Sequence, residues 1–189
     1  TVTAANVGST CTFSRTYTVM AGCPQITLTP GSLPSGTAGV AYSQTIVPGG
    51  STGSYTLAMT GGSLPPGLMF NPATGDISGA PTQVGVFNFT IRATDQFNCF
   101  EERAYALAIT CPTITLSPDN LPDGTVSAAY SQALTAAPAG GNYSFAVTAG
   151  ALPPGLTLAA NGSLSGTLTQ TGTFSFTVTA TGYGGSCTG

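Results

Sequence analysis

Residues 64–95 read LPPGLMFNPATGDISGAPTQVGVFNFTIRATD, and this stretch decides the fold class. The prolines at 65 and 66 fix the backbone and remove two hydrogen-bond donors, so this part cannot be an interior strand. From Gly85 onward the apolar residues Phe87, Phe89 and Ile91 alternate with polar ones, which is the period of a half-buried strand. The stretch therefore predicts a rigid crossing loop, a hairpin turn over 71–76, and a β-strand.

Short sequence motifs recur further along the chain at a fixed interval. Residues 64–68 (LPPGL) return at 152–156, and residues 41–44 (AYSQ) return at 129–132, each 88 positions later. The cysteines keep this interval, as Cys11, Cys99 and Cys187 do, and as Cys23 and Cys111 do. Repetition at a fixed period indicates an array of structural repeats.

The repeat divides the chain into three parts. We expect residues 23–110 to form one complete repeat and residues 111–189 a second repeat that lacks its last strand. Residues 1–22 are expected to be the last hairpin of a preceding repeat, or a donor strand. Since residues 1–4 match residues 177–180, the chain begins and stops at the same phase of the repeat. We therefore expect it to be a window on a longer array.

Short alternating runs separated by Gly and Pro turns predict a seven-stranded β-sandwich for each repeat. In residues 24–110 the expected strands are 25–29, 42–47, 54–60, 68–71, 76–78, 86–94 and 103–110. The expected inward side chains follow period two: Ile26, Leu28, Tyr55, Leu57, Met59, Phe87, Phe89, Ile91, Tyr105, Leu107 and Ile109.

Composition excludes several classes of function. Charged residues make up 5% of the chain, with three Arg and no Lys or His, so there is no basic surface for nucleic acid. No apolar run approaches the ~20 residues of a membrane-spanning helix. Without His or Lys, the chain has neither an imidazole base nor a Schiff-base amine. We expect no enzyme activity, no catalytic residue, no cofactor and no metal site.

Residues 64–79 together with residues 85–95 resemble the "putative Ig domain" repeats of bacterial surface proteins, which are related to cadherin-like domains of dystroglycan type. This resemblance implies an all-β fold of tandem immunoglobulin-like, cadherin-like sandwiches. It also implies a role as a spacer, a stalk or an adhesion module, on the outside of the cell.

The cysteine positions predict two disulfides. Cys99 and Cys111 flank the last strand of a repeat and lie too far apart to bond. In a seven-stranded sandwich the first strand begins at the end where the loop before the last strand lies, so we expect Cys23 to pair with Cys99, and Cys111 with Cys187. Cys11 then has its partner outside the chain. The alternative is five reduced, buried cysteines.

The remaining polar residues give few candidates for chemistry. Glu101 and Glu102 are adjacent on a strand, so their side chains point to opposite faces and make a poor acid–base pair. Asp95 stands where cadherin-like repeats often carry a calcium ligand, but clustered acidic ligands are missing, and a solvated loop carboxylate is the expected alternative.

Three sequons, at Asn88, Asn142 and Asn161, are candidate glycosylation sites. The loop aromatics Phe97 and Tyr183 could contact a ligand, but packing between repeats is the favoured interpretation.

We expect the chain to be a structural repeat of an extracellular, disulfide-stapled stalk or filament that is assembled end to end. Two modes of assembly fit: a continuous array, which we favour, or strand complementation, in which residues 14–22 of one molecule fill the vacant last-strand position of another. The alternative function is a carbohydrate- or protein-binding module of a larger secreted enzyme or adhesin.

Overall fold

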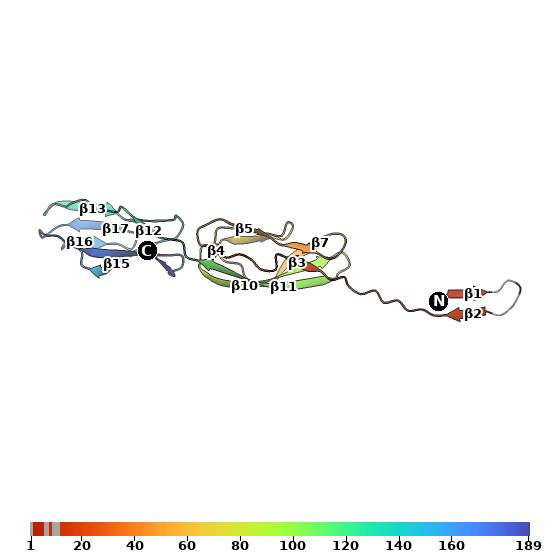
Figure 1. The fold of residues 1–189 in the computed structure, drawn as a ribbon. Helices are drawn as coiled ribbons and strands as arrows, with labels where there is room; N and C mark the ends of the chain where they lie inside the picture. Colours follow the sequence, from red (N-terminus) through yellow and green to blue (C-terminus); the bar gives the residue numbers. More distant parts are fainter. Residues whose placement is uncertain (1, 6–7, 9–11) are drawn as a thin grey trace.

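The computed structural model describes residues 2–5, 8 and 12–189, and the regular elements of this part are all β-strands. Two β-sandwiches lie end to end, and a short hairpin lies beyond them at the N-terminal end (Figure 1). No helix within the described ranges is long and apolar enough to cross a membrane. The expected all-β fold of tandem immunoglobulin-like sandwiches is confirmed.

Repeat 23–110 is a sandwich of two layers. One layer has the strand order β4-β11-β10-β7, and the other consists of β3-β6 and β5-β9-β8. The strands are β3 (Thr27–Thr29), β4 (Gly36–Thr37), β5 (Tyr42–Thr45), β6 (Val47–Gly49), β7 (Tyr55–Gly62), β8 (Leu68–Asn71), β9 (Asp76–Gly79), β10 (Gly85–Asp95) and β11 (Phe100–Thr110).

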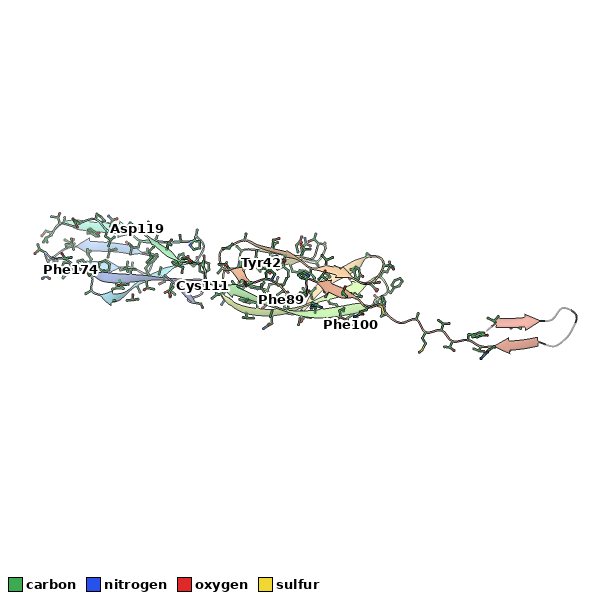
Figure 2. All side chains as sticks on the ribbon, in the orientation of Figure 1. Tyr42, Phe89, Phe100, Cys111, Asp119 and Phe174 are labelled. Atoms are coloured by element: carbon green, nitrogen blue, oxygen red, sulfur yellow. A yellow bond between two sulfur atoms is a disulfide. The ribbon has the colours of Figure 1, made fainter. Side chains whose placement is uncertain are left out.

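The hairpin β10–β11 forms the centre of this repeat, with antiparallel pairing from Gly85↔Ile109 to Thr94↔Phe100. Alternate residues of both strands point inward, so Phe89, Ile91 and Leu107 are 0–2% exposed. Figure 2 shows Phe89 inside the sandwich, whereas Phe100, 57% exposed, lies on the outside. Burial of these alternating side chains is the main force that holds the two layers together.

The strand pattern differs from the expectation in three places. The strand expected over 42–47 is broken into β5 and β6 at Ile46, whose N–H bonds the Gly75 carbonyl at 2.8 Å. The two-residue strand β4 was not expected, and it pairs in parallel with the end of β11. Met59, expected inside, is 42% exposed, because β7 is the edge strand and its register slips opposite Thr90 and Ile91. Repeat 23–110 therefore has nine strands in place of seven.

Repeat 111–189 repeats this architecture up to its last strand. Its strands are β12 (Thr115–Ser117), β13 (Ala129–Ala133), β14 (Thr135–Ala137), β15 (Ser144–Gly150), β16 (Leu156–Leu158), β17 (Ser163–Thr167), β18 (Phe176–Gly182) and β19 (Cys187–Thr188). Its buried apolar residues form two separate clusters, one around Phe145 and one around Leu164, rather than one continuous core.

The N-terminal hairpin pairs β1 (Val2–Ala5) with β2 (Thr12–Arg15), from Val2↔Arg15 to Ala5↔Thr12. The chain then runs without regular structure to β3. In this segment Tyr17, Val19 and Met20 are 62%, 89% and 95% exposed. Residues 16–22 therefore form an apolar, strand-like sequence whose side chains are exposed, whereas Ile26, just before β3, belongs to the core of repeat 23–110.

Candidate functional site

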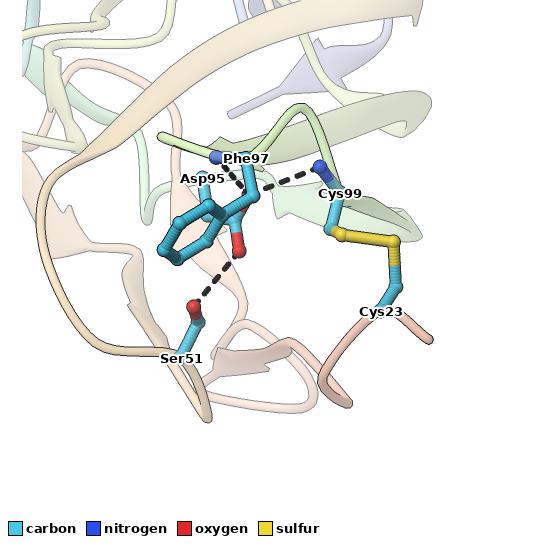
Figure 3. Close-up of a disulfide and its surroundings, with 5 residues drawn as sticks. All are labelled: Cys23, Ser51, Asp95, Phe97 and Cys99. Atoms are coloured by element: carbon cyan, nitrogen blue, oxygen red, sulfur yellow. Dashed lines mark hydrogen bonds between the residues drawn. A yellow bond between two sulfur atoms is a disulfide. The ribbon is translucent and has the colours of Figure 1, made fainter. Parts of the chain in front are cut away.

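The loop between β10 and β11 is tied to the start of its own repeat. Cys23 and Cys99 form a disulfide with a Cα–Cα distance of 5.6 Å, which is the pairing expected from the sequence. Beside it, the carboxylate of Asp95 accepts hydrogen bonds from the N–H groups of Phe97 (2.8 Å) and Cys99 (3.0 Å) and from the Ser51 hydroxyl (2.8 Å) (Figure 3). The loop is therefore fixed by one covalent bond and one buried carboxylate.

Asp95 is 5% exposed, so the expectation of a solvated carboxylate is wrong. Burial raises the pKa of Asp95, but the hydrogen bonds from Ser51, Phe97 and Cys99 outweigh it and hold the pKa below its usual value. Within the described part of the chain, no three acidic, Cys or His side chains gather as metal ligands. Asp95 acts as a loop cap, because its oxygens already accept three hydrogen bonds from the protein.

The variant Asp95→Asn should flatten the acid sensitivity of repeat 23–110. A carboxyl group with a lowered folded pKa stabilises the fold above its unfolded pKa of about 3.9, and this contribution is lost as the pH falls through the folded pKa. The native chain should therefore lose stability below about pH 4, and the variant should lose less of it over the same interval. Thermal unfolding followed by circular dichroism between about pH 2 and 7 measures both slopes.

Glu101→Gln is the matched control for this experiment, since it removes an exposed carboxylate of the neighbouring strand. Equal slopes for the native chain and Asp95→Asn would contradict the prediction. Some acid sensitivity should remain in the variant, because two other carboxylates also have lowered pKa values. A hydrogen bond from Thr45 is the main cause for Asp76, and a hydrogen bond from Thr60 is the main cause for Glu102.

The second disulfide lies where the two sandwiches meet. Cys111 and Cys187 are bonded, with a Cα–Cα distance of 5.6 Å, and this pairing too is the expected one. Cys111 connects the two repeats, and Figure 2 places it between them. Cys11, for which we expected a partner outside the chain, lies outside the described residues.

Tyr183, in the loop after β18, joins the repeats non-covalently. It is 1% exposed and belongs to the core cluster of repeat 23–110, although it lies in the sequence of the other repeat. Its phenol fits against Gly39, where a Cβ would overlap the Tyr183 hydroxyl. Gly39 also has a φ of +76°, a conformation that favours glycine. Tyr183 therefore packs between the repeats, which is the favoured interpretation of the sequence.

A second tyrosine supports Tyr183 from behind. The rings of Tyr143 and Tyr183 meet edge to face with centroids 6.0 Å apart, and the Tyr183 N–H donates to the Gly141 carbonyl at 2.8 Å. Burial of the Tyr143 hydroxyl is the main cause that raises its pKa to about 12, and the neighbouring Tyr183 side chain raises it further. Among the residues that the structure describes, the Tyr183 hydroxyl has no hydrogen-bond partner. The contact is therefore one of shape, and the hydroxyl contributes no polar bond to it.

The other candidate residues do not converge on one place. Glu102 forms an exposed ion pair with Arg92 at 2.9 Å and accepts a hydrogen bond from Thr60, whereas Glu101 is not part of this group. The ring of Phe97 is 62% exposed. All three sequon asparagines, Asn88, Asn142 and Asn161, are exposed on repeat surfaces. The predicted residues thus lie in loops or on exposed surfaces, and the structure does not bring them together as a catalytic centre.

Gly39 is the functional residue that sequence reasoning missed. Its partner Tyr183 was singled out, but no pattern in the sequence connects two residues of different repeats across a junction. The two repeats do differ at both places. Ser127 stands 88 residues after Gly39, whereas Tyr183 corresponds to Gln96, because residues 93–96 (ATDQ) align with residues 180–183 (ATGY) at a local interval of 87.

Comparison with known proteins places these features in a family. The family described as "Putative Ig domain" matches residues 24–110 and again residues 112–188. The "Serine-rich adhesin for platelets" of Staphylococcus aureus strain MRSA252 is 33% identical over 141 residues, which is 72% of this chain and 10% of the adhesin. The same adhesin in strain MSSA476 matches at 33% identity over 72% of this chain and 6% of its own length. The chain thus spans only a small part of these relatives.

Solved structures show weaker likenesses. The protocadherin GammaB4 extracellular domain shares 14% identity with a TM-score of 0.38, covering 84% of this chain and 32% of that one. Drosophila N-cadherin EC1-4 shares 11% identity with a TM-score of 0.36, covering 89% of this chain and 49% of that one. A protein from Bacteroides fragilis described as a "putative alpha-galactosidase" shares 21% identity with a TM-score of 0.37, covering 50% of this chain and 19% of that one. Scores this low carry no functional conclusion.

The family match covers both sandwiches from their first strands onward and agrees with the resemblance expected from residues 64–95. The relatives named above are adhesins of Staphylococcus aureus, and the chain therefore belongs to the family of "Putative Ig domain" repeats.

Proposed function

We propose that this chain is a stiff structural segment of an extracellular surface stalk or filament, which holds an adhesive or other functional part away from the cell. The observation that carries the proposal is the burial of Tyr183 in the end of the neighbouring repeat, where it fills the space left by Gly39. A flexible linker between the repeats would leave this ring exposed. An interlocked ring instead resists bending at the junction, because interiors are close-packed and deform little.

Three further features support an extracellular, load-bearing role. Each repeat carries its own disulfide, and disulfides persist in oxidising compartments outside the cytosol. The curated relatives are adhesins, by the names they carry. The exposed sequons at Asn88, Asn142 and Asn161 are proposed glycan acceptors on the outer surface of the stalk.

The stiffness of the junction is tested by replacing Tyr183. With spin labels on Ser43→Cys and Ser131→Cys, which are exposed positions on separate repeats, pulsed electron resonance measures the distribution of distances between the two sandwiches. A Cys11→Ser background leaves only these two thiols to label. We expect a narrow distribution for the native junction and a clearly broader one for Tyr183→Ala, since this substitution removes the ring that packs against Gly39.

Tyr183→Phe is the matched control, and it should keep the narrow distribution. The hydroxyl has no hydrogen-bond partner among the described residues, so its removal costs no bond and relieves a buried polar group. A broad distribution with the native tyrosine would refute the stiff stalk.

A further inference from the structure

In repeat 23–110 the last strand, β11, completes the core. Its inward residues Tyr105, Leu107 and Ile109 are 3%, 0% and 4% exposed. It pairs with β10 from Gly85↔Ile109 to Thr94↔Phe100, and its far end also pairs in parallel with β4.

In repeat 111–189 the described residues contain only the beginning of this strand. β19 pairs with β18 through Thr181↔Thr188 and Gly182↔Cys187, and Ala180 exchanges two backbone hydrogen bonds with Gly189. Beyond this point two hollows of 570 and 700 Å³ open along the sheet. They share Leu121, Phe174 and Phe176 as walls, so they form one groove, with an apolar floor and polar side chains beside it, where β11 lies in the other repeat.

The chain also carries a strand of the matching sequence. Residues 12–22 stand one repeat before β11, so that Arg15, Tyr17, Val19 and Ala21 correspond to Arg103, Tyr105, Leu107 and Ile109. We propose that this groove binds the segment Arg15–Gly22 of a second copy of the chain, as the last strand of its sandwich.

The charges of groove and strand are complementary. In repeat 23–110 the Arg103 guanidinium donates to the Gly31 carbonyl at 3.0 Å. The repeat places Asp119, labelled on the second sandwich in Figure 2, at the position of Gly31. Asp119 is one of the residues that line the groove. Arg15 would therefore meet a carboxylate where Arg103 meets only a backbone carbonyl. Pairing of opposite charges favours the correct partner and register.

The volumes of groove and strand are also complementary. The tip of Ile109 lies 2.8 Å from the place of a Cβ on Gly36, which means that it fills the space beside this glycine. In repeat 111–189 the tip of Leu168 already fills the same space beside Gly124. The arriving strand needs a small residue there, and it has Ala21. Tyr17 keeps the aromatic ring of Tyr105, whose hydroxyl donates to the Pro30 carbonyl at 3.1 Å, and Pro118 lies at the equivalent place in the groove.

The direction of the strand requires a second copy. In the groove, Gly22 must lie at the end of repeat 111–189 that is remote from repeat 23–110. Within one chain, however, Cys23 is fixed to Cys99 at the opposite end of the molecule (Figure 1). The segment 15–22 of a chain therefore cannot reach the groove of the same chain. Each copy gives its strand to a neighbour and takes one from the next, which is a heterologous contact that builds an open filament.

The ends that would then meet are compatible. The loop of Gln96 in one copy would face Ser127 of its neighbour, as Tyr183 faces Gly39 within the chain. Ser127 carries a side chain where Gly39 has none, and Gln96 takes the place of the bulky phenol. Docking requires one change in the donor: the last pair of its hairpin, Val2↔Arg15, must open.

Sedimentation velocity of the 189-residue chain over a range of concentrations tests the assembly. We expect a concentration-dependent series of head-to-tail oligomers, which Val19→Asp abolishes because its counterpart Leu107 is fully buried. Thr18→Asp is the matched control, since its counterpart Ala106 is exposed and a charge there should be tolerated. Both substitutions fall in an exposed segment, so neither should affect folding of the donor.

Charge reversal tests the proposed ion pair between Arg15 of one copy and Asp119 of the next. Arg15→Asp and Asp119→Arg should each weaken the association, and the double variant should recover most of it. Failure of the double variant to recover association would overturn the assigned register.

A disulfide trap tests the register directly. Asn88 pairs with Ala106 in the first repeat. Residues 176–180 align with residues 89–93 at an interval of 87, so Ser175 corresponds to Asn88 and should lie opposite Thr18 of the second copy. In a Cys11→Ser background, Ser175→Cys with Thr18→Cys should crosslink copies under oxidation. The control Ser175→Cys with Thr16→Cys is displaced by two residues, at ~7–8 Å, and should not.

A chain that stays monomeric at every concentration would overturn the proposal and would leave a following stretch of a longer polypeptide as the occupant of the groove. Association that survives Val19→Asp would overturn it as well. This proposal does not depend on the stiff junction, because Tyr183→Ala broadens the distances within one copy without touching the groove.

Discussion

Loss of the Cys23–Cys99 disulfide is expected to lower the free energy of unfolding of repeat 23–110 by about 4–5 kcal/mol. The bond closes a loop between residues 76 apart, and chain-entropy models assign such a loop this much stabilisation. Domains are stable by only about 5–15 kcal/mol, so the loss should leave the repeat close to unfolding. Phe97, Asp95 and Ser51 depend on the same loop, and their hydrogen bonds should loosen with it.

The measurement is urea unfolding of the variant Cys23→Ser/Cys99→Ala, followed by circular dichroism. The variant Cys111→Ser/Cys187→Ala serves as the reciprocal control, because its bond has the same loop length but belongs to the other repeat. Each double variant should destabilise its own repeat most. Midpoints equal to that of the native chain in both variants would show that the disulfides are not what stabilises the sandwiches.

The disulfide pairing was predictable because it follows from topology. Once the repeat and the strand order are known, the start of the first strand and the loop before the last strand must lie at one end of the sandwich. The bonded pairs Cys23–Cys99 and Cys111–Cys187 stand at these two places. The long strands were predictable for a related reason, since alternation over many residues, as in β10 and β11, is a strong signal.

The details that escaped prediction depend on contacts between distant residues. The break at Ile46 exists because its N–H bonds Gly75, which lies in a turn of another strand pair. The strand β4 exists only because the end of β11 offers it a parallel partner. Asp95 was expected in solvent because Ser51, its hydrogen-bond donor, lies 44 residues earlier in the chain. No local pattern carries this information.

Comparison of the two repeats recovers part of this information on contacts between distant residues. Gly39 and Tyr183, which are in contact, are both positions at which the two repeats differ, with Ser127 and Gln96 as their counterparts. The pair Gly36 with Ile109 against Gly124 with Leu168 shows one space filled from two places in the fold, from β11 in one repeat and from the residue after β17 in the other. An internal repeat thus acts as an alignment of two sequences.

Leu107→Ala is expected to lower the free energy of unfolding of repeat 23–110 by about 3–5 kcal/mol. Leu107 is 0% exposed at the middle of β11 and belongs to the core cluster that both layers share. Truncation removes buried apolar contacts and leaves a cavity, because the surrounding Phe89, Ile91 and Tyr105 are held in regular strands and cannot collapse into it.

The decisive control for Leu107→Ala is the same position one repeat earlier. Val19 corresponds to Leu107 but is 89% exposed, so Val19→Ala should leave the unfolding of the single chain unchanged to within about 0.5 kcal/mol. The two truncations remove apolar atoms at equivalent places of the repeat, and only the environment differs. Urea unfolding at low protein concentration, where copies do not associate, measures both. A loss below about 1 kcal/mol for Leu107→Ala would show that β11 is not part of the core, since a buried leucine truncated in a packed interior costs more than that.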